Sequence, residues 1–196
     1  TQLKFPFSLR PLLAGWNALY LESGPRQSTE TTRSELWQRG EYLVNGVGHC
    51  GACPTPRNAL GTEQGGAAFL GGALVKGWEA PSLTARHPGP VPWTEQAFFD
   101  YLRQGHSAQH GAAGGPMAEV VRNLQDVPEA DVRAMAHYLA SFGSAATPQQ
   151  AEQAAAVAIA HGAQAAPTLL GPAQRMFEQA CAACHHDGAG PRLLGV

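Results

Sequence analysis

Two pairs of cysteines in this chain have the spacing of a covalent haem attachment site. Cys181, Cys184 and His185 form a C-x-x-C-H motif, in which two thiols one helical turn apart can form thioethers to the vinyl groups of a haem. The imidazole that follows then lies under the iron as an axial ligand. The motif predicts that Cys181 and Cys184 hold haem c and that His185 ligates its iron.

Other uses of the C-terminal motif fit the sequence less well. A structural zinc site needs four ligands with matched spacing, and no second such pair follows Cys184. A thioredoxin-like dithiol belongs in a strand–helix–strand context, which the sequence here lacks, and a simple disulfide would not account for His185. Haem attachment is the interpretation we adopt.

The upstream pair, Cys50 and Cys53, repeats the spacing but is followed by Pro54, which cannot ligate iron. Three explanations remain open: a natural loss of the proximal ligand, a substitution or sequence error, and a site without haem. His49 precedes the motif and would need a distorted turn to reach the iron. We expect Cys50 and Cys53 to hold a second haem c, so two haems per chain, the first of them in doubt because of Pro54.

The other axial ligand of the first haem is predicted downstream. Met117 follows a Gly-Gly-Pro loop, as expected of a thioether that approaches the opposite haem face and raises the reduction potential. Arg57 is a candidate partner of a haem propionate, and Trp78 with Pro81 is a candidate wall of the pocket. Five other histidines lack metal-ligand spacing and are interpreted as solvent or loop residues: His87, His106, His110, His137 and His161.

Helices with apolar faces surround these residues in the sequence. Apolar residues recur at helical spacing after Pro11, over 34–44 directly before Cys50, and over 128–139, with a further helix over 94–104. Gly40, opposite Met135 or Tyr138, would let two of these helices cross closely. The pattern predicts an all-α fold of tandem cytochrome c-type domains with long loops.

The order helix-then-motif occurs twice, which divides the chain into four parts. These are an N-terminal extension packing on the next domain over 1–32, a cytochrome c domain over 33–143, an Ala-rich linker over 144–167, and the truncated start of a further cytochrome c domain over 168–196. The opening residues do not resemble a secretion signal. We therefore expect a processed chain or a piece of a longer protein.

Composition limits the partners and the compartment. Charged residues make up 14% of the chain and the net charge is −2, which gives no electrostatic reason to expect nucleic acid or anionic lipid as a partner. No stretch approaches the roughly 20 apolar residues that span a bilayer. All four cysteines belong to the two motifs, and because haem c is attached outside the bacterial cytoplasm, a periplasmic location is expected.

The stretch 39–58 around the first motif resembles the multihaem cytochrome c subunits of membrane-bound bacterial dehydrogenases. The segments 5–7, 77–81 and 115–120 resemble them as well. The resemblance covers most of the chain except the linker, and Pro54 departs from the family's histidine. It implies an electron-transfer subunit at the inner membrane, with no catalysis of its own. The partner would be a catalytic dehydrogenase subunit of molybdopterin or PQQ type, and possible further partners are an iron–sulfur subunit and a quinone or oxidase acceptor.

Residues 185–191 favour the molybdenum aldehyde or nicotinate branch slightly over the quinoprotein alcohol dehydrogenases. Two other classes of function stay open. One is a dihaem peroxidase-like enzyme that uses the site lacking a proximal histidine, although acid–base residues are not grouped around that motif. The other is a docking domain that has lost its haem. The number of haems per chain and peroxide turnover separate these three.

Overall fold

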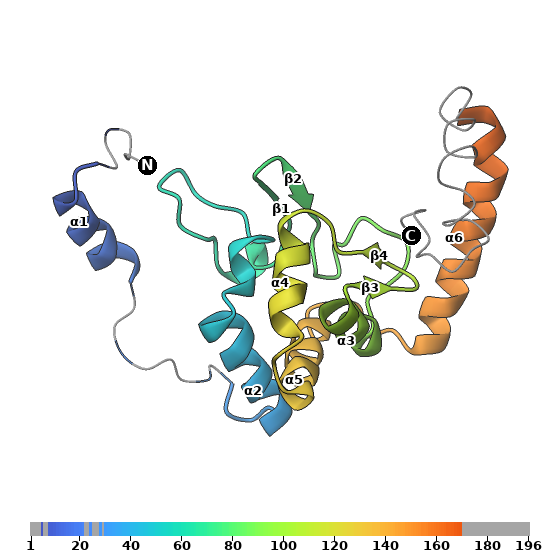
Figure 1. The fold of residues 1–196 in the computed structure, drawn as a ribbon, viewed down its shortest axis with the longest axis horizontal. Helices are drawn as coiled ribbons and strands as arrows, with labels where there is room; N and C mark the ends of the chain where they lie inside the picture. Colours follow the sequence, from blue (N-terminus) through green and yellow to red (C-terminus); the bar gives the residue numbers. More distant parts are fainter. Residues whose placement is uncertain (1–4, 6–7, 22–23, 25–27, 29, 170–196) are drawn as a thin grey trace.

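The computed structural model describes residues 5, 8–21, 24, 28 and 30–169. Across these residues the fold is mainly helical (Figure 1). The α-helices are, in chain order, α1 (Pro11–Tyr20), α2 (Glu35–Tyr42), α3 (Glu95–Gln104), α4 (Pro116–Leu124), α5 (Glu129–Ala140) and α6 (Pro148–Leu169). Short turns of other helix types are η1 (Leu43–Val47), η2 (Cys50–Ala52) and η3 (Gly66–Ala68).

The expected all-α fold is confirmed in outline, but the described chain also contains two small antiparallel sheets. They pair β1 (Ala73–Val75) with β2 (Trp78–Ala80), and β3 (His106–Ser107) with β4 (Gly111–Ala112). Lys76 and Gly77, between β1 and β2, have φ values of 50° and 83°. Two successive residues with positive φ make the turn that suits a two-residue hairpin, and this turn allows the strands to pair.

Side chains and backbone at the helix ends explain where α2 and α3 begin. The Ser34 hydroxyl accepts a hydrogen bond from the Trp37 N–H at 3.2 Å, and the Thr94 hydroxyl accepts one from the Ala97 N–H at 3.1 Å. Each satisfies an N–H that has no partner inside the helix. Helix α3 ends at Gly105, whose φ of 80° is the left-handed conformation that commonly terminates helices.

Helices α2 and α5 cross closely, as the sequence predicts, and Gly40 makes the crossing possible. A Cβ at Gly40 would lie 2.1 Å from the Ala134 carbonyl oxygen and 2.6 Å from the Tyr138 Cβ. The Arg39 guanidinium binds Asp131 across the same crossing at 2.8 and 2.9 Å. Figure 1 shows the two helices side by side.

One apolar core lies between α2, α3 and α5 and extends to the loop after the first cysteine motif. Its buried members are Trp37, Val44, Leu70, Phe98, Phe99, Leu102, Val132, Met135, Ala136, Tyr138 and Leu139. Met135 therefore belongs to the core, as its position on an apolar helix face predicts. A second, smaller contact joins α6 to the loop before α3: Ala151 and Ala155 are buried against Val91.

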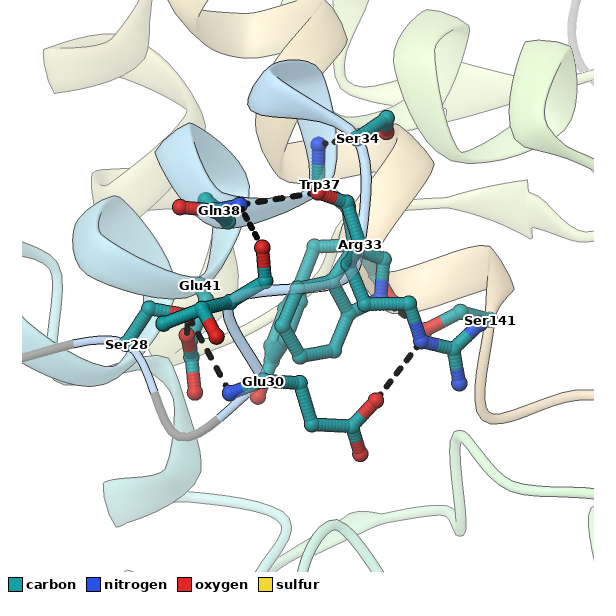
Figure 2. A network of polar contacts seen from close by, with 10 residues as sticks. Ser28, Glu30, Arg33, Ser34, Trp37, Gln38, Glu41 and Ser141 are labelled. Carbon is teal, nitrogen blue, oxygen red and sulfur yellow. Dashed lines mark hydrogen bonds and ion pairs between the residues drawn. The ribbon is translucent and has the colours of Figure 1, made fainter.

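Polar contacts connect the segment before α2 to that helix (Figure 2). The Ser28 hydroxyl donates to the carboxylate of Glu41, which is only 4% exposed. The Gln38 amide donates to the carbonyl oxygens of Thr31 and Arg33. A buried carboxylate requires such hydrogen bonds, so Glu41 fixes this segment on the domain.

Helix α1 lies apart from this core. Leu12, Leu13 and Leu19 are 56%, 52% and 73% exposed, while the Trp16 indole N–H donates to the Leu60 carbonyl oxygen at 3.1 Å. Among the residues that the structure describes, no helix is both long and apolar enough to cross a bilayer.

Candidate haem-attachment site

The first cysteine motif lies in a tight turn at the end of the α2 helical segment. The π-type turn η1 continues α2, and the 3₁₀ turn η2 then carries Cys50. Between them His49 adopts a left-handed conformation with φ of 48°, which is uncommon for a residue with a side chain. Cys50 is half-buried and Cys53 exposed, and both are free thiols.

Two glycines allow the chain to make this turn. A Cβ at Gly51 would lie 2.8 Å from the Phe69 ring and 3.1 Å from the Glu63 carboxylate. A Cβ at Gly48 would lie 2.9 Å from the Leu43 carbonyl oxygen and 3.1 Å from the Cys50 Sγ. All four distances are shorter than ordinary packing contacts, so the turn that presents the two thiols requires residues without side chains at Gly48 and Gly51.

Pro54 occupies the position of the expected proximal histidine and is buried. Its carbonyl oxygen accepts a hydrogen bond from the Gly72 N–H. The next residue, Thr55, is 1% exposed, and its hydroxyl accepts from the Leu70 N–H at 3.1 Å. The end of the motif is thus built into the loop that follows it, and Pro54 offers no donor atom for iron.

His49 does not replace the missing imidazole in this arrangement. Its side chain is exposed, and its Nδ1 lies 3.4 Å from the carbonyl oxygen of Val47 on the same turn. Burial, with a smaller contribution from the neighbouring Cys53, raises the pKa of the Cys50 thiol to about 11. Cys50 is therefore protonated at neutral pH when no haem is attached.

Met117, in the first turn of α4, lies downstream of the motif and packs against the same core. Gly115, with φ of 52°, and Pro116 turn the chain into α4, and the Met117 N–H donates to the Gly114 carbonyl oxygen at 3.1 Å. Met117 and Cys50 are both partly buried and both pack against the core between α2, α3 and α5. The fold therefore brings the thiol and the thioether to one apolar core.

The three other residues proposed from the sequence lie around this region. Arg57 donates to the carbonyl oxygens of Ala52 and Gly61 at 3.2 and 2.6 Å, and its guanidinium lies 3.4 Å from the Glu63 carboxylate. Its contacts thus tie the loop after the motif to the motif turn. A role toward a propionate stays a prediction.

Trp78 belongs to β2 and is 55% exposed. A Cβ at Gly115 would lie 2.5 Å from its ring, so the indole covers the loop that leads into Met117. Pro81, which follows β2, is exposed. Trp78 is therefore placed to hold the Met117 loop, while a contact of either residue with a haem stays a prediction.

These residues fit a covalently attached haem c in part. Two free thiols at C-x-x-C spacing can form the two thioethers, and Met117 can supply one axial ligand beside an apolar core. Pro54 occupies the position at which the motif supplies the second axial ligand, a histidine. The donor set fits attachment and a thioether ligand, and it does not supply the proximal imidazole.

The second motif, with Cys181, Cys184 and His185, lies outside the described residues. Among residues that are described, no group of three or more His, Cys, Asp or Glu side chains could hold a metal ion.

Sequence reasoning missed one cluster near this site. His110, interpreted as a solvent or loop residue, is half-buried with both ring nitrogens inaccessible, and its ring stacks on Trp93 with centroids 3.8 Å apart. His87 lies 6.4 Å from both rings. His110 lies in the turn between β3 and β4, which agrees with its interpretation as a loop residue, but no local spacing signals its contact with Trp93.

Comparisons with known proteins identify the relatives of this chain. A subunit of the nicotinate dehydrogenase of Pseudomonas putida is 47% identical over 200 residues, which cover all of this chain and 16% of that protein. The fructose dehydrogenase cytochrome subunit of Gluconobacter japonicus is 36% identical over all of this chain and 44% of its own length. A diheme cytochrome c-type protein of Cereibacter sphaeroides is 40% identical over 70% of this chain and 45% of its own length.

This chain spans less than half the length of each of these relatives. No family model matches it. Relatives named as subunits of dehydrogenases cover the whole chain, and they include the region of Cys50 and Met117. The chain is therefore a relative of the cytochrome subunits of bacterial dehydrogenases.

Proposed function

We propose that this chain is an electron-transfer subunit that holds haem c at Cys50 and Cys53 and at Cys181 and Cys184. The observation that carries the proposal is that Cys50 and Met117 both pack against one apolar core, in a chain related to cytochrome subunits of dehydrogenases. We assign it no substrate chemistry of its own.

The residues of the first site have distinct tasks in this proposal. The Cys50 and Cys53 thiols bind covalently, the Met117 thioether ligates, and the core beside them excludes water. A bound haem c supplies a one-electron iron couple. Because Pro54 cannot coordinate, Met117 is the one axial ligand that we assign to this site from the described residues.

The second site belongs to a further domain in this proposal. We assign 33–143 to one cytochrome c domain and 168–196 to the start of another, in which His185 ligates the iron. Helix α6, which covers most of the stretch between them, would connect the two.

The partner we propose is the catalytic subunit of a periplasmic dehydrogenase at the inner membrane. The relative at 47% identity is named for nicotinate dehydrogenase, which supports the molybdenum branch over the PQQ branch. An iron–sulfur subunit would pass electrons from the catalytic subunit to this chain. The quinone pool or a terminal oxidase would accept electrons from it. Membrane attachment would come from partners or from further parts of the protein.

The test is a count of covalent haems on the purified chain after expression with a haem-attachment system. A pyridine haemochrome assay and the intact mass should give two haems per chain. The double variant Cys50→Ala/Cys53→Ala should give one, and its matched control, Cys181→Ala/Cys184→Ala, should also give one.

The outcomes divide the alternatives. A single haem that survives Cys50→Ala/Cys53→Ala would make the first domain a docking scaffold, and no haem at all would refute the cytochrome function. Rapid peroxide turnover by the two-haem protein would favour the peroxidase-like enzyme. Pro54→His should leave the haem count unchanged and give the first haem the spectrum of a His/Met-ligated iron.

A further inference from the structure

The loop that leads into Met117 is a tight turn built on two glycines. Gly115 has a φ of 52° and a ψ of −133°, and the Met117 N–H donates to the Gly114 carbonyl oxygen at 3.1 Å. A positive φ at the first central residue, with this hydrogen bond, defines a type II′ turn, which takes glycine at that position. Pro116 is the second central residue and begins α4. The conformation of the turn therefore sets the position of Met117.

Backbone hydrogen bonds hold the chain on either side of this turn. Upstream, the Ala113 N–H donates to the Gly105 carbonyl oxygen at 2.7 Å, and downstream the Ala118 N–H donates to the Gly115 carbonyl oxygen at 3.2 Å. Gly114 and Gly115 lie between these contacts. Glycine has more backbone freedom than any other residue, so two successive glycines keep one conformation only where a further contact restricts them.

Trp78, on the β1–β2 hairpin, supplies such a contact. A Cβ at Gly115 would lie 2.5 Å from both Cδ2 and Cε2 of Trp78, and a Cβ at Gly114 would lie 3.4 Å from its Cζ3. The two rings of the indole share Cδ2 and Cε2, so a point equally close to both lies over the flat face of the ring. Gly115 therefore packs against the indole face, at a distance that leaves no room for a side chain.

The position of Trp78 depends on the hairpin and not on the apolar core. Trp78 is the first residue of β2 and pairs with Val75 of β1. It is 55% exposed, and it is not among the described side chains that form the core between α2, α3 and α5. Its indole therefore contributes to the fold chiefly through what it touches, which includes the two glycines before Met117.

We propose that Trp78 is a positioning residue for Met117: its indole packs on Gly114 and Gly115 and holds the II′ turn that places the thioether against the core. The inference rests on the proposed function, in which Met117 is an axial ligand of the first haem. It deepens that function by assigning control of the ligand to a side chain on another element. This role differs from that of a pocket wall, because it requires no contact between Trp78 and the haem.

The advantage of a turn that is already fixed is entropic. Ordering a flexible loop costs conformational entropy, and for a free Gly-Gly pair that cost would oppose ligation by Met117. If Trp78 fixes the turn before haem is attached, the cost is already met in the haem-free fold, and the thioether binds iron more strongly. The proposal therefore predicts one effect in the haem-free chain and another on the haem.

The first experiment measures amide hydrogen exchange in the haem-free full chain. Trp78→Ala should speed exchange of the Met117 amide about tenfold, because its hydrogen bond to Gly114 would open more often. Trp78→Phe keeps a flat ring and should keep most of the protection. Leu74→Ala is the matched control and should change nothing, since Leu74 is 76% exposed on the same hairpin and pairs with Glu79 on the face opposite to Trp78.

Amides of α5 show in the same experiment whether the core remains folded. If Trp78→Ala does not fold, Trp78→Leu takes its place with the same expectation, because it keeps a large apolar side chain and removes the flat ring.

The second experiment follows the ligand in the full chain with Cys181→Ala/Cys184→Ala, so that only the first haem is attached. Thioether-ligated ferric haem has a characteristic charge-transfer absorption band, and methionine ligation raises the reduction potential. Trp78→Ala should weaken the band and lower the midpoint potential toward the values of Met117→Ala, with the haem content unchanged. Trp78→Phe should restore both.

The outcomes separate this inference from the proposed function. Full band strength and an unchanged potential in Trp78→Ala would overturn the inference and leave the proposed function intact. If Met117→Ala changes neither band nor potential, Met117 is not the ligand, and the inference fails with that assignment. If the parent attaches no haem, the proposed function fails at the first site, and unchanged amide exchange in Trp78→Ala would then overturn the role of Trp78 as well.

Discussion

Trp37 and Trp93 lie against the same apolar core, yet their indole N–H groups differ in hydrogen bonding. The Trp37 indole N–H donates to the Ser141 hydroxyl at 3.0 Å, and that hydroxyl donates to the Tyr138 carbonyl oxygen at 2.6 Å. The Trp93 indole N–H has no hydrogen bond to any described residue. The Trp37 indole is therefore satisfied within the fold, whereas the residues that the structure describes do not satisfy the Trp93 indole.

The difference extends to the elements around each ring. On the side of Trp37, helices α2 and α5 pack directly on each other, and Gly40 leaves no space between them. Around Trp93, the loop before α3 and the turn between β3 and β4 border the core, and His110 is found there. The core is thus bordered by closely packed helices around Trp37 and by loops around Trp93.

The largest loss of stability is expected from disrupting the crossing of α2 and α5. Gly40→Ala places a Cβ against a backbone oxygen that cannot move away, so we expect a loss of about 3 kcal/mol in unfolding free energy. Chemical denaturation of the haem-free chain measures it. Gly15→Ala in α1, where a Cβ meets nothing within 4 Å, is the control and should change little; an equal loss there would refute the crossing.

The two thiols of the first motif should differ in reactivity. A pKa of about 11 for Cys50 lowers its thiolate fraction at pH 8 on the order of 100-fold below that of an ordinary thiol, and the thiolate is the form that reacts. Iodoacetamide should therefore modify Cys53 first in the haem-free chain. Peptide mass spectrometry after short labelling times measures the ratio, and similar rates would show that Cys50 is not buried.

Replacing each tryptophan by phenylalanine sharpens the comparison. Trp37→Phe leaves the Ser141 hydroxyl without its donor and should cost about 1 kcal/mol with or without haem. Trp93→Phe removes an N–H that has no partner among the described residues, so it should cost less than Trp37→Phe in the haem-free chain. Thermal unfolding of the two variants tests this, and an equal cost would remove the distinction between the two rings.

The smallest effect concerns the Arg39–Asp131 ion pair at the helix crossing. The hydrogen bond from Arg39 lowers the pKa of Asp131, so the pair stabilises the fold above the ordinary pKa of aspartate. This contribution is lost as the pH falls through the lower folded-state value. Arg39 is exposed, so solvent screens the pair, and Asp131→Asn should weaken only the acid dependence of stability below about pH 4.

The helices and their crossing could be predicted because their signals are local. Leu36, Trp37, Leu43 and Val44 repeat at helical spacing, and Gly40 is the small residue that a close crossing needs. The hairpins were missed, since strands of three residues such as Ala73–Val75 are too short to show alternation.

Part of the candidate site could be predicted because covalent attachment of a haem requires two cysteines at a fixed spacing. The C-x-x-C motifs name their own cysteines, and a Gly-Gly-Pro loop before a methionine singles out Met117. By contrast, the stacking of His110 on Trp93 depends on how the loops on either side of α3 fold together. Such contacts leave no periodic trace in the sequence.

The seat of α6 on Val91 has a mechanical consequence. With Ala151 and Ala155 buried against one valine, the 22 residues of α6 form an arm about 33 Å long at 1.5 Å per residue. A tilt of about 10° at its base would carry the far end roughly 6 Å sideways at that length. The small side chains of Ala151 and Ala155 allow α6 to pack closely on Val91, and this contact therefore sets the orientation of the helix.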